Sequence, residues 1–135
     1  MSRILSIFRG AAFAAAALLC TGCGGGDAPG TGPKPVPGTA VVSLAGARAD
    51  DGAVLLEVGT GVTAVAAGGS ATIGAGPQTT DGRRRVLVLG ALQGDLLRLT
   101  VSDVKQLPAV QVREVAANDG SLRDLSGYSA QVRAQ

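Results

Sequence analysis

The sequence predicts an all-β fold, an antiparallel β-sandwich of about seven to nine short strands. Three observations favour this class. Short apolar runs with period-two alternation recur from residue 39 to the end of the chain, helical periodicity is weak, and Asp-Gly pairs and glycines separate the runs. The 97 residues that carry this pattern are enough for one domain with a modest core of Val, Leu and Ala.

Six runs are expected to be strands, because aliphatic and β-branched residues alternate in them with polar ones. They are residues 40–45, 52–58, 86–90, 96–102, 109–115 and 128–133. The alternation is clearest at Leu97, Leu99 and Val101, which polar residues separate. These three side chains are therefore expected to share the buried face of one strand.

Turn signals separate the runs. Three Asp-Gly pairs suit tight hairpin turns, because glycine adopts positive φ freely and aspartate tolerates it. They are Asp51-Gly52, Asp81-Gly82 and Asp119-Gly120. Residues 62–75, rich in small side chains, are expected to form weaker strands around a turn at Gly68-Gly69. Closely spaced strands with no helices between them indicate an antiparallel sandwich.

The first 38 residues do not share this pattern. Arg3 and Arg9 supply positive charge, and residues 11–19 form an uncharged apolar stretch. Nine residues match the core of a secretory signal and fall well short of the about 20 that span a bilayer. Residues 24–38 hold six Gly and four Pro. That composition is typical of a tether, which would reach about 20 Å as a coil or about 45 Å as polyproline II.

Small residues precede a cysteine at the end of the apolar stretch, where the chain reads Cys-Thr-Gly-Cys up to Cys23. This segment resembles the bacterial lipobox. The resemblance implies that a signal peptide over 1–22 is removed and that Cys23 is acylated, giving a lipid anchor in the cell envelope on the extracytoplasmic side. Cys20 is the poorer candidate, because Leu19 would then stand at the cleavage point. In such lipoproteins, an Asp directly after the acylated cysteine favours the inner membrane. This chain has Gly24 at that position, so the resemblance implies the outer membrane if the organism has one.

The expected organisation is a signal peptide over 1–22, a lipidated cysteine with a linker over 23–38, and a β-sandwich domain over 39–135. The full chain has 12 Lys and Arg against 10 Asp and Glu. Because Arg3 and Arg9 lie in the signal, the mature chain carries ten of each, and its balanced charge predicts no nucleic-acid partner. Cys20 lies in the expected signal peptide and the thiol of Cys23 is expected to carry the lipid, so the domain has no thiol for a disulfide or a metal site.

The composition argues against an enzyme. The chain has no histidine, which excludes Ser-His-acid triads, histidine-assisted cysteine catalysis and histidine-ligated metal sites. Ser102 and Lys105 match the SxxK spacing of penicillin-binding enzymes, but that spacing needs a helix, and these residues end a strand pattern. We therefore predict no catalytic residue and no cofactor.

Sugar hydrolysis or binding would depend on carboxylates and aromatic side chains. Paired carboxylates hydrolyse glycosides, but those of the domain lie mainly in turns, where a structural role is favoured. They are Asp50, Asp51, Glu57, Asp81, Asp95, Asp103, Glu114, Asp119 and Asp124. Tyr128 is the single aromatic residue of the mature chain, which argues against an aromatic platform for sugars.

Two further motifs have both a binding and a structural interpretation. Residues 50–52 and 118–120 offer oxygen ligands to calcium, yet neither matches the spacing of a calcium loop, so turn formation is favoured and no metal is predicted. The three arginines 83–85 suit phosphates, anionic headgroups or an acidic partner. The favoured interpretation is a solvated or edge strand that the charges protect from aggregation.

The layout of the strands between Val41 and Val132 resembles cohesin-type sandwiches, with an Asp-Asp-Gly turn after the first strand and a closing Gly-Tyr-Ser strand. The resemblance implies a protein-binding module. We therefore expect a membrane-tethered binding or adhesion module that recognises a protein through a sheet face or edge. The alternative is a structural or envelope-assembly lipoprotein without a discrete ligand.

Overall fold

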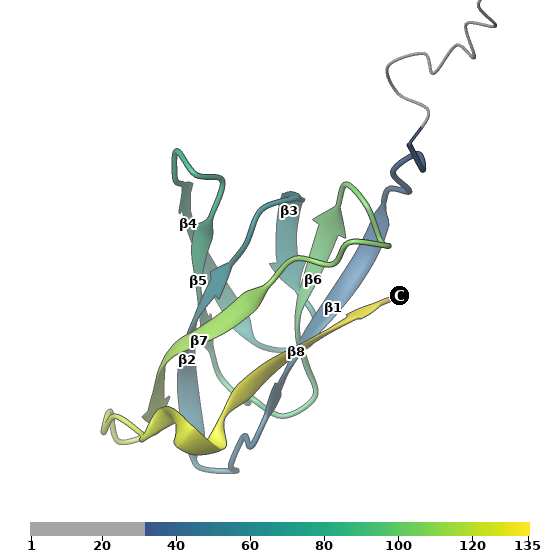
Figure 1. Ribbon diagram of the computed structural model, residues 1–135. Coiled ribbons are helices and arrows are strands. Elements are labelled where there is room, and N and C mark those ends of the chain that lie inside the picture. The colour runs from purple at the N-terminus through teal and green to yellow at the C-terminus, as the bar shows by residue number, and fades with distance from the viewer. Residues whose placement is uncertain (1–31) are drawn as a thin grey trace, which may run out of the picture. The chain divides into compact units, whose positions relative to one another are not determined.

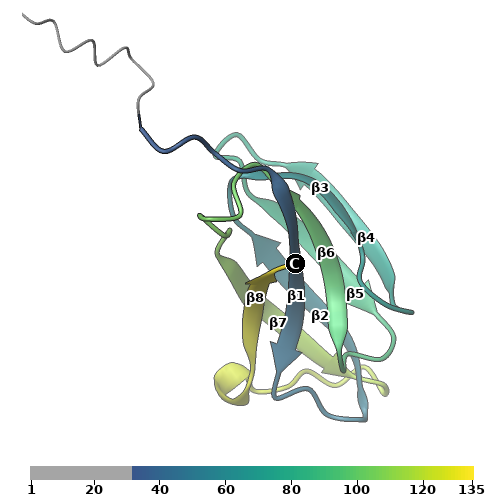
Figure 2. The ribbon, with the colours of Figure 1, turned by 90° about the vertical axis from the view of Figure 1, so that its right-hand side faces the viewer.

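Two four-stranded antiparallel sheets face each other in the computed structural model, which describes residues 32–135 (Figures 1 and 2). The eight strands confirm the predicted all-β sandwich. The expected signal peptide, Cys23 and most of the expected linker lie outside the described residues. Within residues 32–135, no helix has the length and hydrophobicity to cross a membrane.

The sheets interleave strands from all parts of the chain. Sheet A has the order β3 (Val62–Ala67), β6 (Asp95–Val101), β1 (Gly38–Ala45) and β8 (Ser129–Ala134). Sheet B has the order β4 (Thr72–Gln78), β5 (Arg84–Leu89), β2 (Asp51–Val58) and β7 (Val110–Ala117). A short 3-10 helix, η1 (Leu125–Gly127), precedes β8. All six expected runs are strands, within two residues at each end, and the weaker region contains β3 and β4.

The core lies between the sheets because alternate side chains of each strand point inward. Its largest fully buried side chains are Leu56, Leu92, Leu96, Leu97, Leu99, Val42, Val54, Val58, Val86, Val88, Val101 and Val115. The expected burial of Leu97, Leu99 and Val101 is confirmed. Leu96 is buried as well, because the register between β1 and β6 shifts there by one residue, as in a β-bulge.

The chain crosses from one sheet to the other at every connection except β4 to β5. Asp81-Gly82 lies in that one hairpin, as predicted, with Gly82 at φ 81° and the Thr79 N–H donating to the Arg83 carbonyl oxygen at 2.7 Å. Gly68-Gly69 does lie at a bend between β3 and β4, although these strands belong to different sheets.

The other two Asp-Gly pairs do not connect neighbouring strands of one sheet. The prediction of a hairpin turn at Asp51-Gly52 is wrong, because Asp51 begins β2 and is buried, and the turn precedes it. The physical reason is that β1 and β2 lie in different sheets, so a longer arch must join them. Asp119-Gly120 does form a tight turn, but only the single bridge from Ala116 to Leu122 follows it in sheet B.

A polar network closes the end of the sandwich where β1 finishes and β8 begins. Asp51 is the one buried charged residue among those described, at 2% exposure. Its carboxylate accepts hydrogen bonds from the Arg48 N–H at 2.8 Å, the Tyr128 hydroxyl at 2.8 Å and Arg123 Nε at 3.0 Å. Arg123 also contacts Asp50. The network joins the arch before β2 to the segment before β8, two regions that are distant in sequence.

The same arch contains Gly46, which has φ 85°. A Cβ at this position would overlap the carbonyl oxygen of Gly127, so glycine is required both by the backbone conformation and by the close approach. The arch and η1 are therefore packed against each other as well as hydrogen bonded.

The arginine run does not mark an edge strand. β5 lies between β4 and β2, so the predicted edge position is wrong, and the edges of sheet B are β4 and β7. The edge strand β4 contains Gly76 and Pro77, at which its register with β5 shifts. A proline at an edge limits pairing with another chain, which is the protection the arginines were expected to give.

Candidate functional site

The outer face of sheet B carries exposed aliphatic side chains. Leu87 and Leu89 of β5 point away from the core and are 39% and 44% exposed. Leu55 of β2, which is half-buried, lies directly opposite Leu87. Leu122, which is 70% exposed, pairs with Ala116 of β7 and is joined to Leu89 on the same face through Ala53 and Ala116. Gly74, opposite Leu87 on β4, has no side chain to cover it. We call these four leucines the aliphatic patch.

The outer face of sheet A is different. Val41 points outward from β1, yet it is only 2% exposed. Its neighbours across the two flanking strands are Arg98 on β6 and Arg133 on β8, whose long aliphatic stems are placed to cover it. Arg133 Nη2 is held by Asp95 Oδ1 at 2.8 Å. The protein thus shields an outward apolar residue on sheet A and leaves the leucines of sheet B open.

Next to the aliphatic patch, three guanidinium groups surround one carboxylate on the same face. Glu57 Oε1 accepts from Arg113 Nη2 at 2.8 Å and from Arg83 Nη1 at 3.2 Å, and its Oε2 lies 3.9 Å from Arg85 Nε. The Glu57 side chain is 12% exposed, whereas those of the three arginines are 43% to 70% exposed. The hydrogen bond from Arg113 is the largest of the effects that hold the pKa of Glu57 below its usual value.

The arginines come from three parts of the chain. Arg85 stands opposite Glu57 on β5, and Arg83 comes from the β4 to β5 hairpin. Arg113 reaches the same carboxylate because the register of β7 shifts opposite Leu55, which leaves Arg113 as an extra residue beside the exposed Glu114. Sequence reasoning singled out the arginine run but missed Glu57 and Arg113 as its partners.

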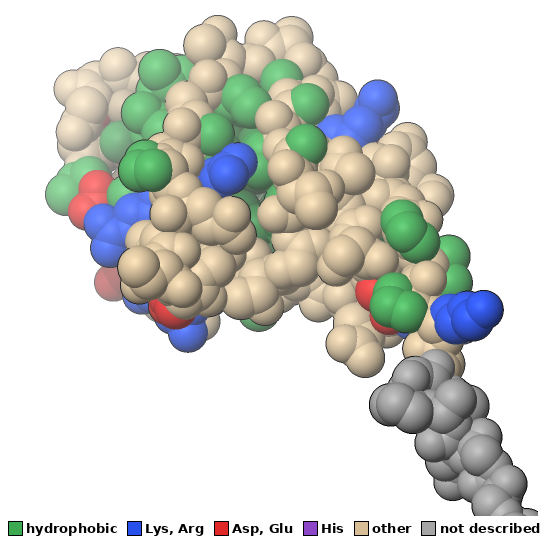
Figure 3. All heavy atoms as spheres, turned by 90° about the horizontal axis from the view of Figure 1, so that it is seen from above, with side chains coloured by type: hydrophobic (Ala, Val, Ile, Leu, Met, Phe, Trp, Pro, Cys, Tyr) green, Lys and Arg blue, Asp and Glu red, His purple; other side chains and the backbone are tan. Residues whose placement is uncertain are grey.

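These side chains line a cleft of about 390 Å³. Gly76 and Pro77 form its β4 side, Arg84 and Arg85 its β5 side, and Arg113 its β7 side. We call it the arginine-lined cleft. Seen from the end of the sandwich at which β1 begins, Lys and Arg side chains (blue) form separate groups among hydrophobic (green) and other (tan) ones, and acidic side chains (red) lie beside the basic group at the left margin (Figure 3).

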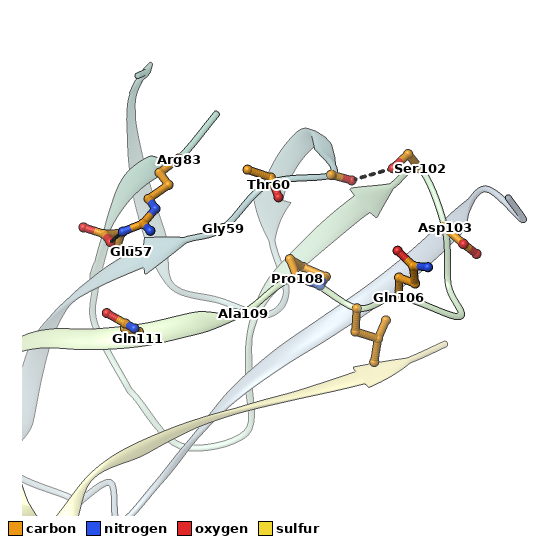
Figure 4. Close-up of a pocket in the computed structure, with 12 residues that line it drawn as sticks. Glu57, Gly59, Thr60, Arg83, Ser102, Asp103, Gln106, Pro108, Ala109 and Gln111 are labelled. Atoms are coloured by element: carbon orange, nitrogen blue, oxygen red, sulfur yellow. Dashed lines mark hydrogen bonds and ion pairs between the residues drawn. The ribbon is translucent and has the colours of Figure 1, made fainter. Parts of the chain in front are cut away.

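A second cleft of about 370 Å³ shares Glu57 and Arg83 with the first. Figure 4 shows these two at one side of it and Ser102, Asp103 and Gln106 at the other. Ser102 Oγ donates to the Gly61 carbonyl oxygen at 3.3 Å. The segment after β6 forms no helix, and no hydrogen bond is found there between Ser102 and Lys105. The SxxK spacing therefore produces no serine-lysine pair in the described residues.

Asp103 holds the segment that leads into β1 through hydrogen bonds to its side chain. Its Oδ1 accepts the N–H of Lys105 at 3.0 Å and the N–H of Val36 at 3.1 Å, and these backbone hydrogen bonds hold the pKa of Asp103 below its usual value. The Val36 carbonyl oxygen accepts in turn from the N–H of Val104 at 2.8 Å. The chain is thus fixed to the domain two residues before β1 begins at Gly38.

The two segments considered for calcium lie side by side, because the N–H of Asn118 donates to the carbonyl oxygen of Asp50 at 2.8 Å. Arg123 pairs with both Asp50 and Asp51, and Asp119 accepts the N–H and the hydroxyl of Ser121 at 2.9 and 2.6 Å. Within residues 32–135, no three acidic, histidine or cysteine side chains form a group suited to a metal. Tyr128 is likewise engaged with Asp51.

No family model matches the chain, and no curated protein or solved structure matches it at a significant level. The function is therefore inferred from the outer face of sheet B.

Proposed function

We propose that this chain is a lipid-anchored, extracytoplasmic binding module that recognises a protein through the outer face of sheet B. The observation that carries the proposal is the aliphatic patch beside the arginine-lined cleft on one face. Scattered single apolar residues are ordinary on a protein surface, but a contiguous group rimmed by charged residues is typical of an interaction site. Arginine is also enriched at protein interfaces.

The lipid anchor at Cys23, proposed from the lipobox-like segment, would confine the module to a membrane surface. Side chains on a sheet stand roughly perpendicular to it, so the leucines of β5 project from the side of the sandwich. The chain enters at the end of the sandwich where β1 begins (Figure 2). A partner that lies alongside the domain can therefore reach this face while the entry segment stays attached to Asp103.

Site-specific crosslinking tests the binding face. A photoreactive residue in place of Leu87 should give one discrete crosslinked product on cells of the source organism, and mass spectrometry should identify the same protein in repeated experiments. The matched control carries the residue in place of Thr100, which is exposed on the outer face of sheet A, and should give no such product. Leu89→Asp should reduce the Leu87 product severalfold, because a charge would enter an apolar contact.

Equal labelling from Leu87 and Thr100 would sink the binding proposal. The alternative, a structural or envelope-assembly lipoprotein without a discrete ligand, would then be favoured if deletion of the gene weakened the envelope. A partner that crosslinks from Leu87 and is lost with Leu89→Asp would contradict that alternative.

The anchor has its own test at Cys23. Cys23→Ser should leave the chain unprocessed at this position and without lipid, so mass spectrometry should find no acylated N-terminus and far less protein should be processed and membrane-bound. Cys20→Ser is the matched control and should still be processed and retained. A processed, membrane-bound Cys23→Ser protein would rule out this lipid site.

A further inference from the structure

The arginine-lined cleft has hydrogen-bond donors in excess of the acceptors that fill it. A guanidinium has five N–H donors and no acceptor. Arg85 Nε lies 3.9 Å from Glu57, beyond hydrogen-bond distance, and the Arg85 side chain is 70% exposed. Within residues 32–135, Arg84 makes no ion pair and Arg113 pairs with Glu57 alone. The cleft therefore retains capacity for a second anion.

Glu57 holds these donors in position. Its carboxylate is largely covered and binds Arg113 and Arg83 through hydrogen bonds of 2.8 and 3.2 Å, so both guanidinium groups are oriented before any ligand arrives. One carboxylate cannot balance three guanidinium groups, and Asp81, which lies 3.3 Å from Arg83 Nε, balances one more. A planar guanidinium matches a carboxylate in bidentate geometry, which makes a carboxylate a well-suited ligand.

The cleft and the aliphatic patch are in register along one strand. Arg85, Leu87 and Leu89 alternate on the outer face of β5, each about 6.8 Å from the next. An extended polypeptide places its own alternate side chains at the same spacing. β5 also runs away from the end at which β1 begins, so a layer of lipid headgroups at that end would not cover its leucines (Figure 1).

We infer that the outer face of β5 binds an extended protein segment with the pattern acidic-x-aliphatic-x-aliphatic, in either chain direction, whose acidic side chain enters the arginine-lined cleft. This inference rests on the proposed function and specifies its partner. The acidic side chain meets Arg85 and Arg113, and the two aliphatic side chains lie against Leu87 and Leu89. The leucines supply apolar contact area, and the arginines fix the register of the segment.

A peptide titration of the full-length protein in detergent tests the inference. In the probe peptide, Thr occupies every second position, and the positions between hold one Glu followed by two Val. The control peptide has the same composition, but its Glu is moved by one position, so that in an extended strand it points to the side opposite the two Val. The probe should bind, the control should bind at least tenfold more weakly, and raising the salt concentration should weaken the probe's binding. NMR chemical shifts of the protein, followed up to millimolar concentrations of peptide, detect weak binding as well.

Variants separate the cleft from the patch. Arg85→Gln and Arg113→Gln should each weaken binding of the probe about tenfold, since each removes a charge-assisted hydrogen bond. Arg98→Gln, on the outer face of sheet A, is the matched control and should leave it unchanged. Unaltered melting temperatures would show that the arginine variants remain folded.

The failures can be told apart. If Leu89→Asp abolishes the cellular crosslink while Arg85→Gln and Arg113→Gln alter neither the crosslink nor the peptide titration, the inference is overturned and the proposed function stands. If none of the three variants alters the crosslink, the proposed function fails too. Equal binding of both peptides, or full competition by inorganic phosphate or phosphatidylglycerol vesicles, would overturn the inference in favour of an unspecific anion site or a membrane contact.

Discussion

Asp51→Asn is expected to lower the free energy of unfolding by about 3 kcal/mol, because breaking a buried, hydrogen-bonded charge pair leaves its partners unsatisfied. The carboxylate accepts from the Arg48 N–H, the Tyr128 hydroxyl and Arg123. An asparagine keeps one acceptor oxygen and presents an NH2 group to donors. Asp50→Asn is the control: Asp50 is 66% exposed, and its loss should cost less than about 1 kcal/mol. Denaturant unfolding at neutral pH measures both.

The same substitution should flatten the acid side of the stability profile. Burial by itself raises the pKa of Asp51, but the hydrogen bonds from Arg48, Tyr128 and Arg123 outweigh it and hold the pKa below the usual 3.8. The folded protein therefore binds this proton less readily than the unfolded chain. The stabilisation is present above the usual pKa and is lost as the pH falls below about 4. A gap between wild type and Asp51→Asn that stays constant from pH 7 to pH 3 would contradict this origin.

Leu56→Ala is expected to lower the free energy of unfolding by about 3 to 4 kcal/mol, through lost burial and a residual cavity. Leu56 is fully buried on β2, one of the two inner strands of sheet B, between Val86 and Val112. Leu87→Ala removes the same side chain from the opposite face of the neighbouring strand, where it is 39% exposed, and should cost less than about 1 kcal/mol. Chemical denaturation of the two variants gives the comparison.

Equal losses for the two leucines would contradict this assignment of faces. They would also bear on function, since a leucine needed for stability requires no partner to explain it. A small loss for Leu87→Ala together with a weakened crosslink would separate the binding face from the core.

Sequence patterns located the strands because period-two alternation is local. Leu97, Leu99 and Val101 lie on one face for that reason, as expected. The run over residues 86–90 is apolar on both faces, so its alternation could not show which side faces the core. Such a run on a two-layer sandwich is itself a signal for a covered outer face, and it could have pointed to Leu87 and Leu89.

The rest of the site depends on long-range pairing. Glu57 and Arg113 meet because β2 and β7 are neighbours and because β7 carries an extra residue at that point. Neither fact is visible in a local window of sequence. The wrong prediction of a hairpin turn at Asp51-Gly52 has the same origin. An Asp-Gly pair favours a tight turn locally, but β1 and β2 lie in different sheets and need a longer arch between them. Asp51 instead begins β2 and accepts a hydrogen bond from Tyr128.

The alternation of the chain between the two sheets also determines when the domain can fold. β1 is the first strand to be made, but it is an inner strand of sheet A, flanked by β6 and by β8, the last strand. With one hairpin in the whole sandwich, few pairings can form early, and folding dominated by distant pairings is slow. Sheet B has all of its strands once Ala117 has been made, but sheet A remains open along β1 until Ser129–Ala134 has appeared, so premature release would expose that strand to aggregation.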